Sequence, residues 1–427
     1  MNPKHIVNRL LGEEYYYMKH PSGLGIYVHP KKGYCSNYAV LGTNFGSINN
    51  KFRLSGEKSF TKVPDGIAHY LEHKLFESPE GDAFSLFAKT GASANAYTSF
   101  EKTAFLFSCT ENFEQSLGIL LDFVSSPYFT PENVEKERGI IGQEIKMYED
   151  SPEWKVLINL LGALYKNHPI NKDIAGSVES IAKITPEMLY ECYNTFYNLN
   201  NMTLCIVGDL DPDRIFTIVD KKLKYSKPLN IERYFPEEPH EVAKKYISQK
   251  FDIQSSIFNL GFKENATSSA RVTNEELVYT DIMLNYFSSP SSEMYDELLS
   301  NGLINTSSFG NEYLEGPGYR SIIFSGETNN PEKAAEVIKK HMEKAHSEGL
   351  NKEAFERAKK AVYGQSLSVF NNVPAIANLT LEFDFSGKEI FEYMDILQSA
   401  TLEKANKRLE KELNPEFSAL SVVEPLK

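Results

Sequence analysis

The chain shows neither the long apolar segments that mark membrane-spanning or secreted proteins nor the positive net charge that is typical of nucleic-acid-binding proteins. No apolar run approaches the roughly 20 residues that a helix needs to cross a bilayer. Residues 1–17 carry charges in place of the apolar core of a secretion signal. The formal net charge of −13 disfavours nucleic acid and anionic membranes as partners. We therefore expect a globular protein of the cytoplasm, with no membrane or nucleic-acid partner.

Cysteine is also scarce, with four residues that stand far apart. They are Cys35, Cys109, Cys192 and Cys205, and none belongs to a Cys-x-x-Cys pair. Cys109 and Cys205 lie in apolar, strand-like runs. This spacing disfavours a thiolate metal site and favours buried, reduced thiols, which are typical of a reducing compartment.

What is present suits two domains of similar build. The chain has 427 residues, of which 41% are apolar and 24% charged, and single cores rarely grow beyond about 250–300 residues. The pairs Glu137-Arg138 and Glu356-Arg357 lie in long helical patterns and are offset by 219 residues. We expect a first domain at 1–225, a charged, proline-containing linker at 226–248 and a second domain at 249–427.

The hydrophobic patterns predict alternating strands and helices in both halves. In the first half we expect strands at 25–28, 38–43, 92–98, 103–109 and 202–208, and helices at 66–76, 113–126, 131–148 and 181–197, the last with Thr185-Pro186 as a start signal. In the second half we expect strands at 320–325 and 419–423, a helix at 331–347 and a long helix that contains Glu356. The shared order of elements predicts a duplicated α/β domain.

His69-Tyr70-Leu71-Glu72-His73 is the most informative stretch of the chain. In a helix, His69 and His73 lie one above the other with Cβ atoms about 5–6 Å apart, so that they can bind one metal ion. Glu72 lies beside them, close enough to contact a water molecule at the metal without being a ligand. Two imidazoles and a carboxylate in this order form the inverted zincin motif of zinc hydrolases. The same pattern also arises by chance, and its histidines then make ordinary hydrogen bonds.

A catalytic zinc ion usually has three protein ligands and one open position, so a third ligand is needed. Glu137 and Glu144 stand two turns apart on one face of the helix predicted at 131–148. Glu149 and Asp150, near its end, are competing candidates. A solvated helix face is the more common reason for such a glutamate-rich segment. Spacing alone therefore leaves the third ligand open.

Together these stretches resemble the insulinase-like (pitrilysin) metallopeptidases, a family that includes insulysin and the mitochondrial processing peptidase. The matching stretches are Gly66 to Phe76, similar to the family's zinc helix; Gly91 to Thr98, similar to its substrate-binding edge strand; Glu137-Arg138 through Glu144, similar to its second metal helix; and His168-Pro169 to Gly176 with Tyr197 to Asp209, similar to the end of its first domain. The likeness is strong over residues 15–225 and extends to the second half only in pattern. It implies an α/β (α+β) fold of two homologous domains, each a mostly antiparallel sheet packed with helices, which form half of a clamshell around an inner chamber. The second domain would be an inactive homologue of the first.

By this resemblance His69, His73 and Glu144 bind one Zn²⁺ per chain, and Glu72 is the general base. Glu137 would orient a ligand from outside the metal's own ligand set. Glu144 is preferred as the third ligand because Glu137-Arg138 matches the family's register on this helix. The implied activity is that of a metalloendopeptidase, in which zinc activates water and Glu72 takes its proton.

The resemblance also implies a substrate-binding strand, which contains Ala94, Asn95, Ala96 and Tyr97. Its backbone would pair with the backbone of an extended peptide. We therefore expect short or unfolded peptides as substrates, cleaved inside an enclosed chamber.

One part of the family's pattern is broken. Family members with a complete site carry an arginine and a tyrosine in the second domain, where this chain has Leu298 and Asn305. Loss of such oxyanion support typically costs about 10²–10³-fold in rate. The chain thus resembles the zinc-bearing subunit of a bacterial two-subunit peptidase, with a metal-free paralogue, or a second copy of itself, as its partner. Alternatively, Tyr313, Tyr319 or Arg320 replaces the missing pair locally.

Two other functions stay open at this point. One is a non-catalytic peptide-binding or assembly subunit, in which zinc stabilises the fold. The intact Glu72 argues against it, because a structural zinc site needs no base. The other is a dedicated peptide-maturation factor that acts on one particular peptide.

Overall fold

The computed structural model describes residues 3–79, 81–266 and 270–426. Its helices and strands pack into two compact units. Unit 1 consists of Met1–Ile145, Asp173–Tyr234 and Leu367–Ile390, and unit 2 of Lys146–Lys172, Phe235–Ser366 and Phe391–Lys427. Each unit thus takes one segment from the opposite half of the chain. The division of the sequence at 226–248 stays a prediction, since the compact units follow other boundaries.

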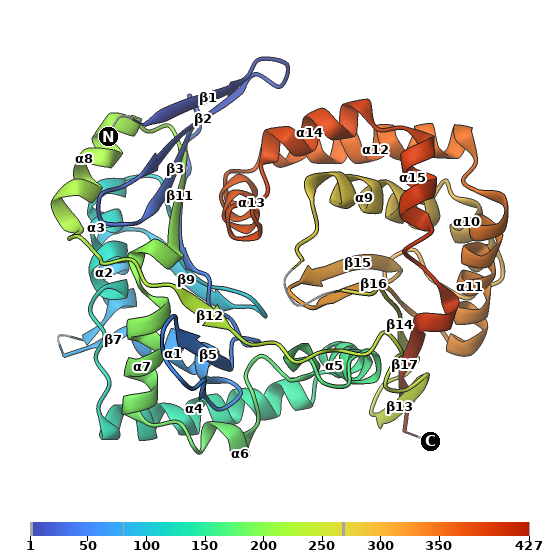
Figure 1. Ribbon diagram of the computed structural model, residues 1–427, viewed down its shortest axis with the longest axis horizontal. Helices are drawn as coiled ribbons and strands as arrows, with labels where there is room; N and C mark the ends of the chain where they lie inside the picture. Colours follow the sequence, from blue (N-terminus) through green and yellow to red (C-terminus); the bar gives the residue numbers. More distant parts are fainter. Residues whose placement is uncertain (1–2, 80, 267–269, 427) are drawn as a thin grey trace. The chain divides into compact units, whose positions relative to one another are not determined.

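The main sheet of unit 1 has the strand order β1-β2-β3-β11-β4-β10-β9 and is antiparallel except for the pair β3–β11 (Figure 1). Its strands are β1 Lys4–Asn8, β2 Glu13–Lys19, β3 Gly25–Pro30, β4 Asn37–Thr43, β9 Ser93–Thr98, β10 Thr103–Cys109 and β11 Met202–Gly208. The strands expected at 103–109 and 202–208 are found at these residues. β9, which carries the predicted substrate-binding residues, forms one edge of the sheet.

The sheet of unit 2 has the order β13-β17-β14-β16-β15. It repeats the arrangement of β3-β11-β4-β10-β9, the five strands that end the sheet order of unit 1. Its strands are β13 Tyr246–Phe251, β14 Ile257–Lys263, β15 Gly310–Gly316, β16 Tyr319–Glu327 and β17 Ser418–Pro425. In both sets of five strands the first pair is parallel and the others are antiparallel. Leu41 pairs with Phe105 in unit 1, and Leu260 pairs with Phe324 in unit 2, an offset of 219 residues at both positions. The predicted fold, two similar and mostly antiparallel sheets packed with helices, is confirmed.

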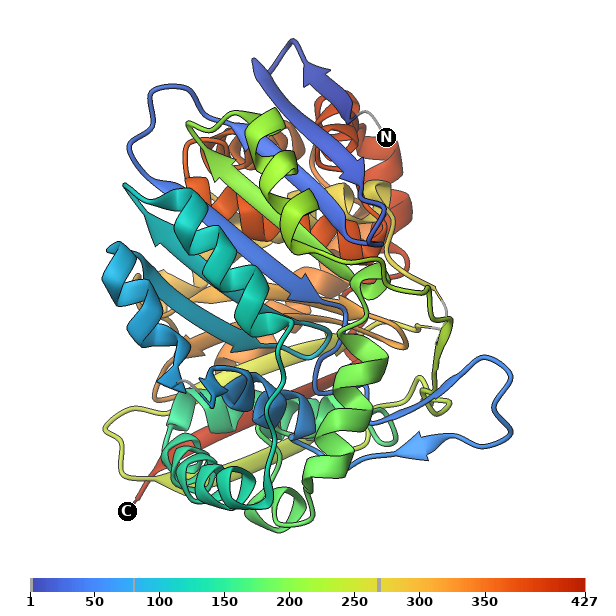
Figure 2. The same cartoon turned by 90° about the vertical axis from the view of Figure 1, so that its left-hand side faces the viewer.

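The helices of unit 1 lie around its sheet. They are α1 Ile67–Leu75, α2 Ala83–Thr90, α3 Phe113–Val124, α4 Pro131–Glu149, α6 Val178–Ile181, α7 Pro186–Phe196, α8 Pro212–Lys222 and α13 Val373–Ser386, with the last four residues of α4 counted in unit 2. α3 packs on β4 and β10 and against α8, on the side that faces the viewer in Figure 2. The helix expected at 181–197 does not begin at 181: α6 ends at Ile181, and a second helix, α7, starts after it. The second begins at Pro186 because the Thr185 side chain accepts the Met188 N–H and proline suits a first helical turn.

α13 comes from the second half of the chain and lies on the other face of this sheet, against β4 and β11 (Figure 1). Alternate residues of β4 separate the two faces. Ala39 and Leu41 belong to the core cluster that includes α1 and α3, whereas Tyr38 and Gly42 contact α13. A Cβ atom at Gly42 would lie 2.7 Å from the side chain of Leu381. Glycine therefore permits this close approach of helix and strand.

Unit 2 is covered in the same way by α5 (Pro152–Leu164), which comes from the first half of the chain and packs on β13, β14 and β17. A Cβ atom at Gly261 would lie 2.7 Å from Leu164 and 3.0 Å from Leu160. Gly261 is thus the counterpart of Gly42. The remaining helices of the second half of the chain are α9 Asn274–Ser288, α10 Glu293–Ser300, α11 Pro331–Glu348, α12 Lys352–Val369, α14 Ile390–Ser399 and α15 Leu402–Leu409. The sequence did not predict this exchange of helices between the two sheets.

The segment expected as a linker contains ordered strands. Residues Ile231–Arg233 form β12, which pairs with β5 (Lys51–Leu54) in a small sheet completed by β6 (Thr61–Lys62). Its last residues, from Tyr246 on, belong to β13. No helix among the described residues is long and apolar enough to cross a membrane.

All four cysteines are free thiols. Cys109, Cys192 and Cys205 are buried, as expected, and burial raises the pKa of Cys109 to about 11. The expectation was wrong for Cys35, which is exposed in the loop between β3 and β4. Cys35 lies outside the strands and helices whose packing buries the other three cysteines.

Candidate metal centre and peptide-binding strand

α1 carries the His-x-x-Glu-His residues on a buried helix. It begins after Gly66, which has a φ of +91° and where a Cβ would lie 2.3 Å from a backbone oxygen. The hydroxyl of the fully buried Tyr70 donates a hydrogen bond to the Val134 carbonyl of α4. His69 and Glu72 are each 8% exposed. This packing fixes the position of the motif relative to α4.

Glu144 of α4 meets both histidines. Its Oε1 lies 3.6 Å from Nε2 of His69, and its Oε2 lies 3.3 Å from Nε2 of His73. The ligand atoms of the three residues lie within 4.8 Å of one another, and no other such group is found in the described part of the chain. The rival candidates Glu149 and Asp150 are exposed and lie outside this group.

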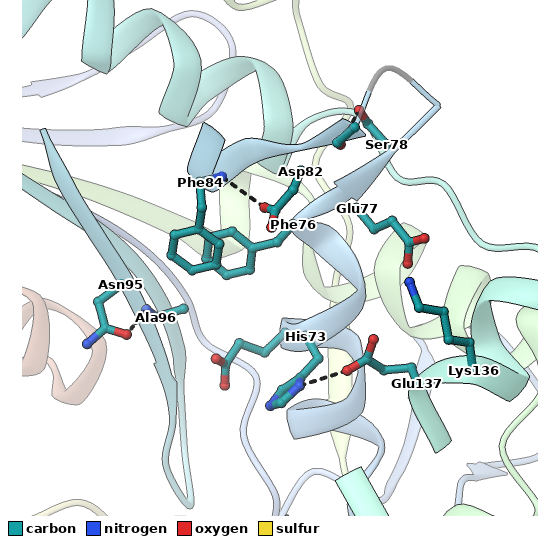
Figure 3. Close-up of a pocket in the computed structure, with 12 residues that line it drawn as sticks. His73, Phe76, Glu77, Ser78, Asp82, Phe84, Asn95, Ala96, Lys136 and Glu137 are labelled. Carbon is teal, nitrogen blue, oxygen red and sulfur yellow. Dashed lines mark hydrogen bonds and ion pairs between the residues drawn. The ribbon is translucent and has the colours of Figure 1, made fainter. Parts of the chain in front are cut away.

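Glu137 contacts His73 at its other ring nitrogen. Its Oε1 lies 3.0 Å from Nδ1 of His73 (Figure 3). Nε2 of His73 is thereby left to face Glu144. A carboxylate on the far nitrogen is a usual partner of a metal-binding histidine, because it fixes the tautomer and the ring orientation. Nδ1 of His69 is buried, and no hydrogen-bond partner is found for it among the described residues. The two histidines are therefore supported differently.

The charges of these groups depend on one another. The imidazoles of His69 and His73, which lie close to its carboxylate, hold the pKa of Glu144 far below its usual range. Burial opposes a charge on His73, but its contacts with Glu137 and Glu144 raise its pKa to about 10. A divalent cation at the same atoms would offset the same carboxylate charges while both imidazoles are neutral. Two imidazole nitrogens and one carboxylate oxygen are a donor set that catalytic zinc accepts, so the residues present fit this ion.

Glu72 interacts electrostatically with all three donor residues. It lines a pocket of about 520 Å³ together with His73; Figure 3 shows this pocket, with His73 labelled. Its Oε2 accepts a hydrogen bond of 2.7 Å from Oγ1 of Thr98, the last residue of β9. The predicted base and the predicted substrate strand are thus joined directly. The pocket also contains Phe76 and Phe84, whose rings stack with centroids 4.3 Å apart. Phe84 was not predicted as a pocket residue, because nothing in the sequence indicates that its ring meets Phe76.

The four predicted substrate-binding residues divide between the two faces of β9. Asn95 and Ala96 line the pocket, and Oδ1 of Asn95 accepts the Ala96 N–H at 2.8 Å. Ala94 packs against the core with Ala96. The side chain of Tyr97 points toward α13, where its hydroxyl donates to Oδ1 of Asn378 at 2.9 Å. Asn378 was not predicted as a partner of β9, because no sequence signal relates it to a strand so distant in the chain.

The residues that break the family's pattern lie in unit 2. Leu298 is fully buried in the core, and Asn305 lies in an exposed turn in which its Oδ1 accepts backbone N–H bonds. Of the three residues considered as local substitutes, Tyr313 and Arg320 both contact the buried carboxylate of Glu264. Tyr319 is 4% exposed. These side chains are therefore engaged within unit 2.

Known proteins resemble the chain over almost its whole length. The family profile described as "Insulinase (Peptidase family M16)" matches residues 58–178, and that described as "Peptidase M16 inactive domain" matches residues 183–362. A Bacillus subtilis protein named uncharacterized zinc protease YmfH is 40% identical over 407 residues, which cover 94% of this chain and 95% of that protein.

Solved structures agree with this assignment. The crystal structure of an M16-like peptidase from Alicyclobacillus acidocaldarius is 36% identical, with a TM-score of 0.92 over 97% of this chain and 99% of that chain. The crystal structure of a protease from Helicobacter pylori shares the fold at 18% identity, with a TM-score of 0.79 over 99% of this chain and 100% of that chain. The chain belongs to peptidase family M16, the insulinase family.

Proposed function

We propose that this protein is a zinc-dependent endopeptidase that hydrolyses short or unfolded peptides. The observation that carries the proposal is the convergence of His69, His73 and Glu144 beside Glu72, on two separate helices. The name of its Bacillus subtilis relative supports zinc as the metal, and membership of a peptidase family supports peptides as substrates. Three ligands and a free position are typical of a catalytic zinc site, whereas structural sites use four protein ligands.

The residues of the chain would divide the chemistry among them. Bound zinc lowers the pKa of a water molecule to about 7 and polarises a carbonyl group. Glu72 takes the proton of the attacking water and returns it to the leaving amine. Burial raises the pKa of Glu72, against the attraction of His69, which suits a group that must accept and then release a proton. Thr98 holds this carboxylate at the end of β9, and Glu137 sets the tautomer of His73.

β9 is the proposed binding strand for the substrate. Within the described residues it pairs with β10 alone, so its other edge can pair with a peptide. The Ala96 N–H donates to the side chain of Asn95, a bond that a peptide carbonyl can replace. Pairing of this kind requires an extended backbone in the substrate, which favours short or unfolded peptides over folded proteins.

We also propose that the chain is the zinc-bearing subunit of a two-subunit peptidase in a reducing compartment such as the cytoplasm. Leu298 and Asn305 supply neither a positive charge nor a phenol, and the nearby Tyr313 and Arg320 are bonded within unit 2. A second copy of the chain would bring the same two residues, so a metal-free paralogue is favoured as the source of an arginine and a tyrosine. The three buried free thiols support a reducing compartment.

Hydrolysis of a quenched fluorescent peptide library tests both proposals. The zinc-loaded chain is assayed alone and with a metal-free paralogue from the same genome, beside Glu72→Gln. Cleavage that needs the paralogue and is lost in Glu72→Gln supports both. Cleavage by the chain alone supports the peptidase and refutes the need for a partner. Zinc binding without cleavage in either mixture refutes the peptidase and favours a non-catalytic peptide-binding subunit, whereas cleavage of one peptide in a broad panel favours a maturation factor.

A further inference from the structure

We propose that Asn378 of α13 is a positioning residue for β9, so that the second half of the chain supports peptide binding in unit 1. The inference rests on the proposed function, because it concerns the strand along which the peptide would bind. It assigns to α13 a role beyond covering the sheet. Asn378 itself lies on the face of β9 opposite Glu72 and is not a catalytic residue.

α13 is held on the sheet by polar contacts with its inner strands. Oγ1 of Thr380 lies 3.1 Å from Nε2 of His29, which is buried in β3. Asp384 accepts a hydrogen bond of 2.7 Å from Tyr27 in β3 and one of 2.5 Å from Thr203 in β11. These strands are paired on both sides. α13 is therefore a firm base for the groups that it presents to the edge of the sheet.

Asn378 joins this base to the edge. Its Oδ1 accepts the hydrogen bond of 2.9 Å from the Tyr97 hydroxyl of β9. Its Nδ2 donates to the Tyr38 hydroxyl of β4 at 3.0 Å and to the Pro374 carbonyl, one turn earlier in α13, at 2.9 Å. One amide thus ties the edge strand to an inner strand and to the helix backbone.

β9 is consequently held on both of its faces. Thr98 donates to Glu72 on one face, and Tyr97 donates to Asn378 on the other. Neighbouring residues of a strand point to opposite sides, so the two bonds hold the end of β9 between α1 and α13. Glu382 of α13 also forms an ion pair with Lys102, in the turn that follows β9.

β9 is an edge strand, and in the proposed function it binds a second backbone. A strand at an edge has ladder bonds on one side only and is less restrained than an inner strand. If β9 had to be ordered when the peptide arrives, the lost conformational entropy would weaken binding. The bond from Tyr97 to Asn378 orders the strand beforehand. Its loss should weaken peptide binding and leave zinc binding and the cleavage step unchanged.

The test compares two hydroxyl deletions on the same amide. Tyr97→Phe removes the bond between Asn378 and β9, whereas Tyr38→Phe, the matched control, removes the bond between Asn378 and β4. The zinc-loaded full chain is assayed with an extended fluorogenic peptide, together with the partner subunit if the wild type needs it. We expect Tyr97→Phe to raise KM by about 2- to 12-fold at unchanged kcat, and Tyr38→Phe to leave KM unchanged. Asn378→Ala should raise KM as much as Tyr97→Phe, and the two changes combined should add little more.

Amide hydrogen exchange provides a readout that does not depend on turnover. Faster exchange of residues 93–98 in Tyr97→Phe than in Tyr38→Phe supports the inference, and equal exchange in the two variants overturns it even if no peptide is cleaved. If Tyr97→Phe and Tyr38→Phe have equal KM values while hydrolysis still requires Glu72, the inference is overturned and the proposed function stays intact. A loss of kcat and zinc affinity at constant KM also overturns it, because that result indicates a general loss of structure.

Discussion

Replacement of Glu137 by glutamine should weaken zinc binding and preserve the fold. Oε1 of Glu137 lies 3.0 Å from Nδ1 of His73, and only 12% of the Glu137 side chain is exposed. Glutamine has nearly the same shape, and its carbonyl oxygen can still accept the hydrogen bond from Nδ1. The change therefore isolates the charge with which the carboxylate supports a metal-binding imidazole.

The expected loss is about 10- to 100-fold in zinc affinity, which equals about 1.4–2.7 kcal/mol. Exposed ion pairs contribute at most about 1 kcal/mol, because water screens them. The low exposure of Glu137 places this contact above that limit. Removing the charge of Glu137 should therefore lower zinc affinity more than removing any surface charge on the same helix.

Competition with a chromophoric zinc chelator measures the affinity, and thermal unfolding followed by circular dichroism checks the fold. Glu135→Gln is the matched control, because Glu135 lies on the exposed side of α4 and pairs with Arg138 rather than with a histidine. Wild-type zinc affinity in Glu137→Gln would refute the reasoning. An equal loss in Glu135→Gln would refute it as well, since the effect would then come from net charge alone.

Three further predictions concern the fold. Gly42→Ala should lower the unfolding free energy by about 1–3 kcal/mol, because the new Cβ would lie 2.7 Å from the buried Leu381; urea unfolding measures the loss, and wild-type stability would contradict the close approach. Burial lowers the pKa of His168 to about 4. Because an unfolded histidine takes up its proton near pH 6.5, the contribution of His168 to stability is complete above about pH 6.5 and falls by on the order of 3 kcal/mol toward pH 4. The midpoint of urea unfolding, measured at each pH, should show this fall. If stability depends on pH in the same way in His168→Gln, the fall belongs to other groups. Ellman's reagent should modify one thiol, Cys35, in the native protein and all four after unfolding, and a second reactive thiol in the native state would contradict the burial of the others.

The sequence was sufficient for the parts of the site that depend on local geometry. His69 and His73 share a helix face because they are four residues apart, and Glu72 lies next to them for the same reason. The candidate third ligand was not determined in this way, because spacing on α4 left Glu149 and Asp150 open beside Glu144. The packing of α1 on α4, through contacts such as the hydrogen bond from Tyr70 to the Val134 carbonyl, brings Glu144 to the histidines. A contact between two helices cannot be read from the period of either one.

By itself the sequence determined most strands and helices, the internal repeat and the metal motif, because all of these are recorded in short-range periodicity or in the offset of similar segments. Only the tertiary structure decided that α13 covers the sheet of unit 1 and α5 that of unit 2. Any amphipathic helix can cover many apolar surfaces, so its own sequence does not name the surface that it covers. The close approach of α13 at Gly42 and the hydrogen bond from Tyr97 to Asn378 form only once strand and helix have been brought together from distant parts of the chain.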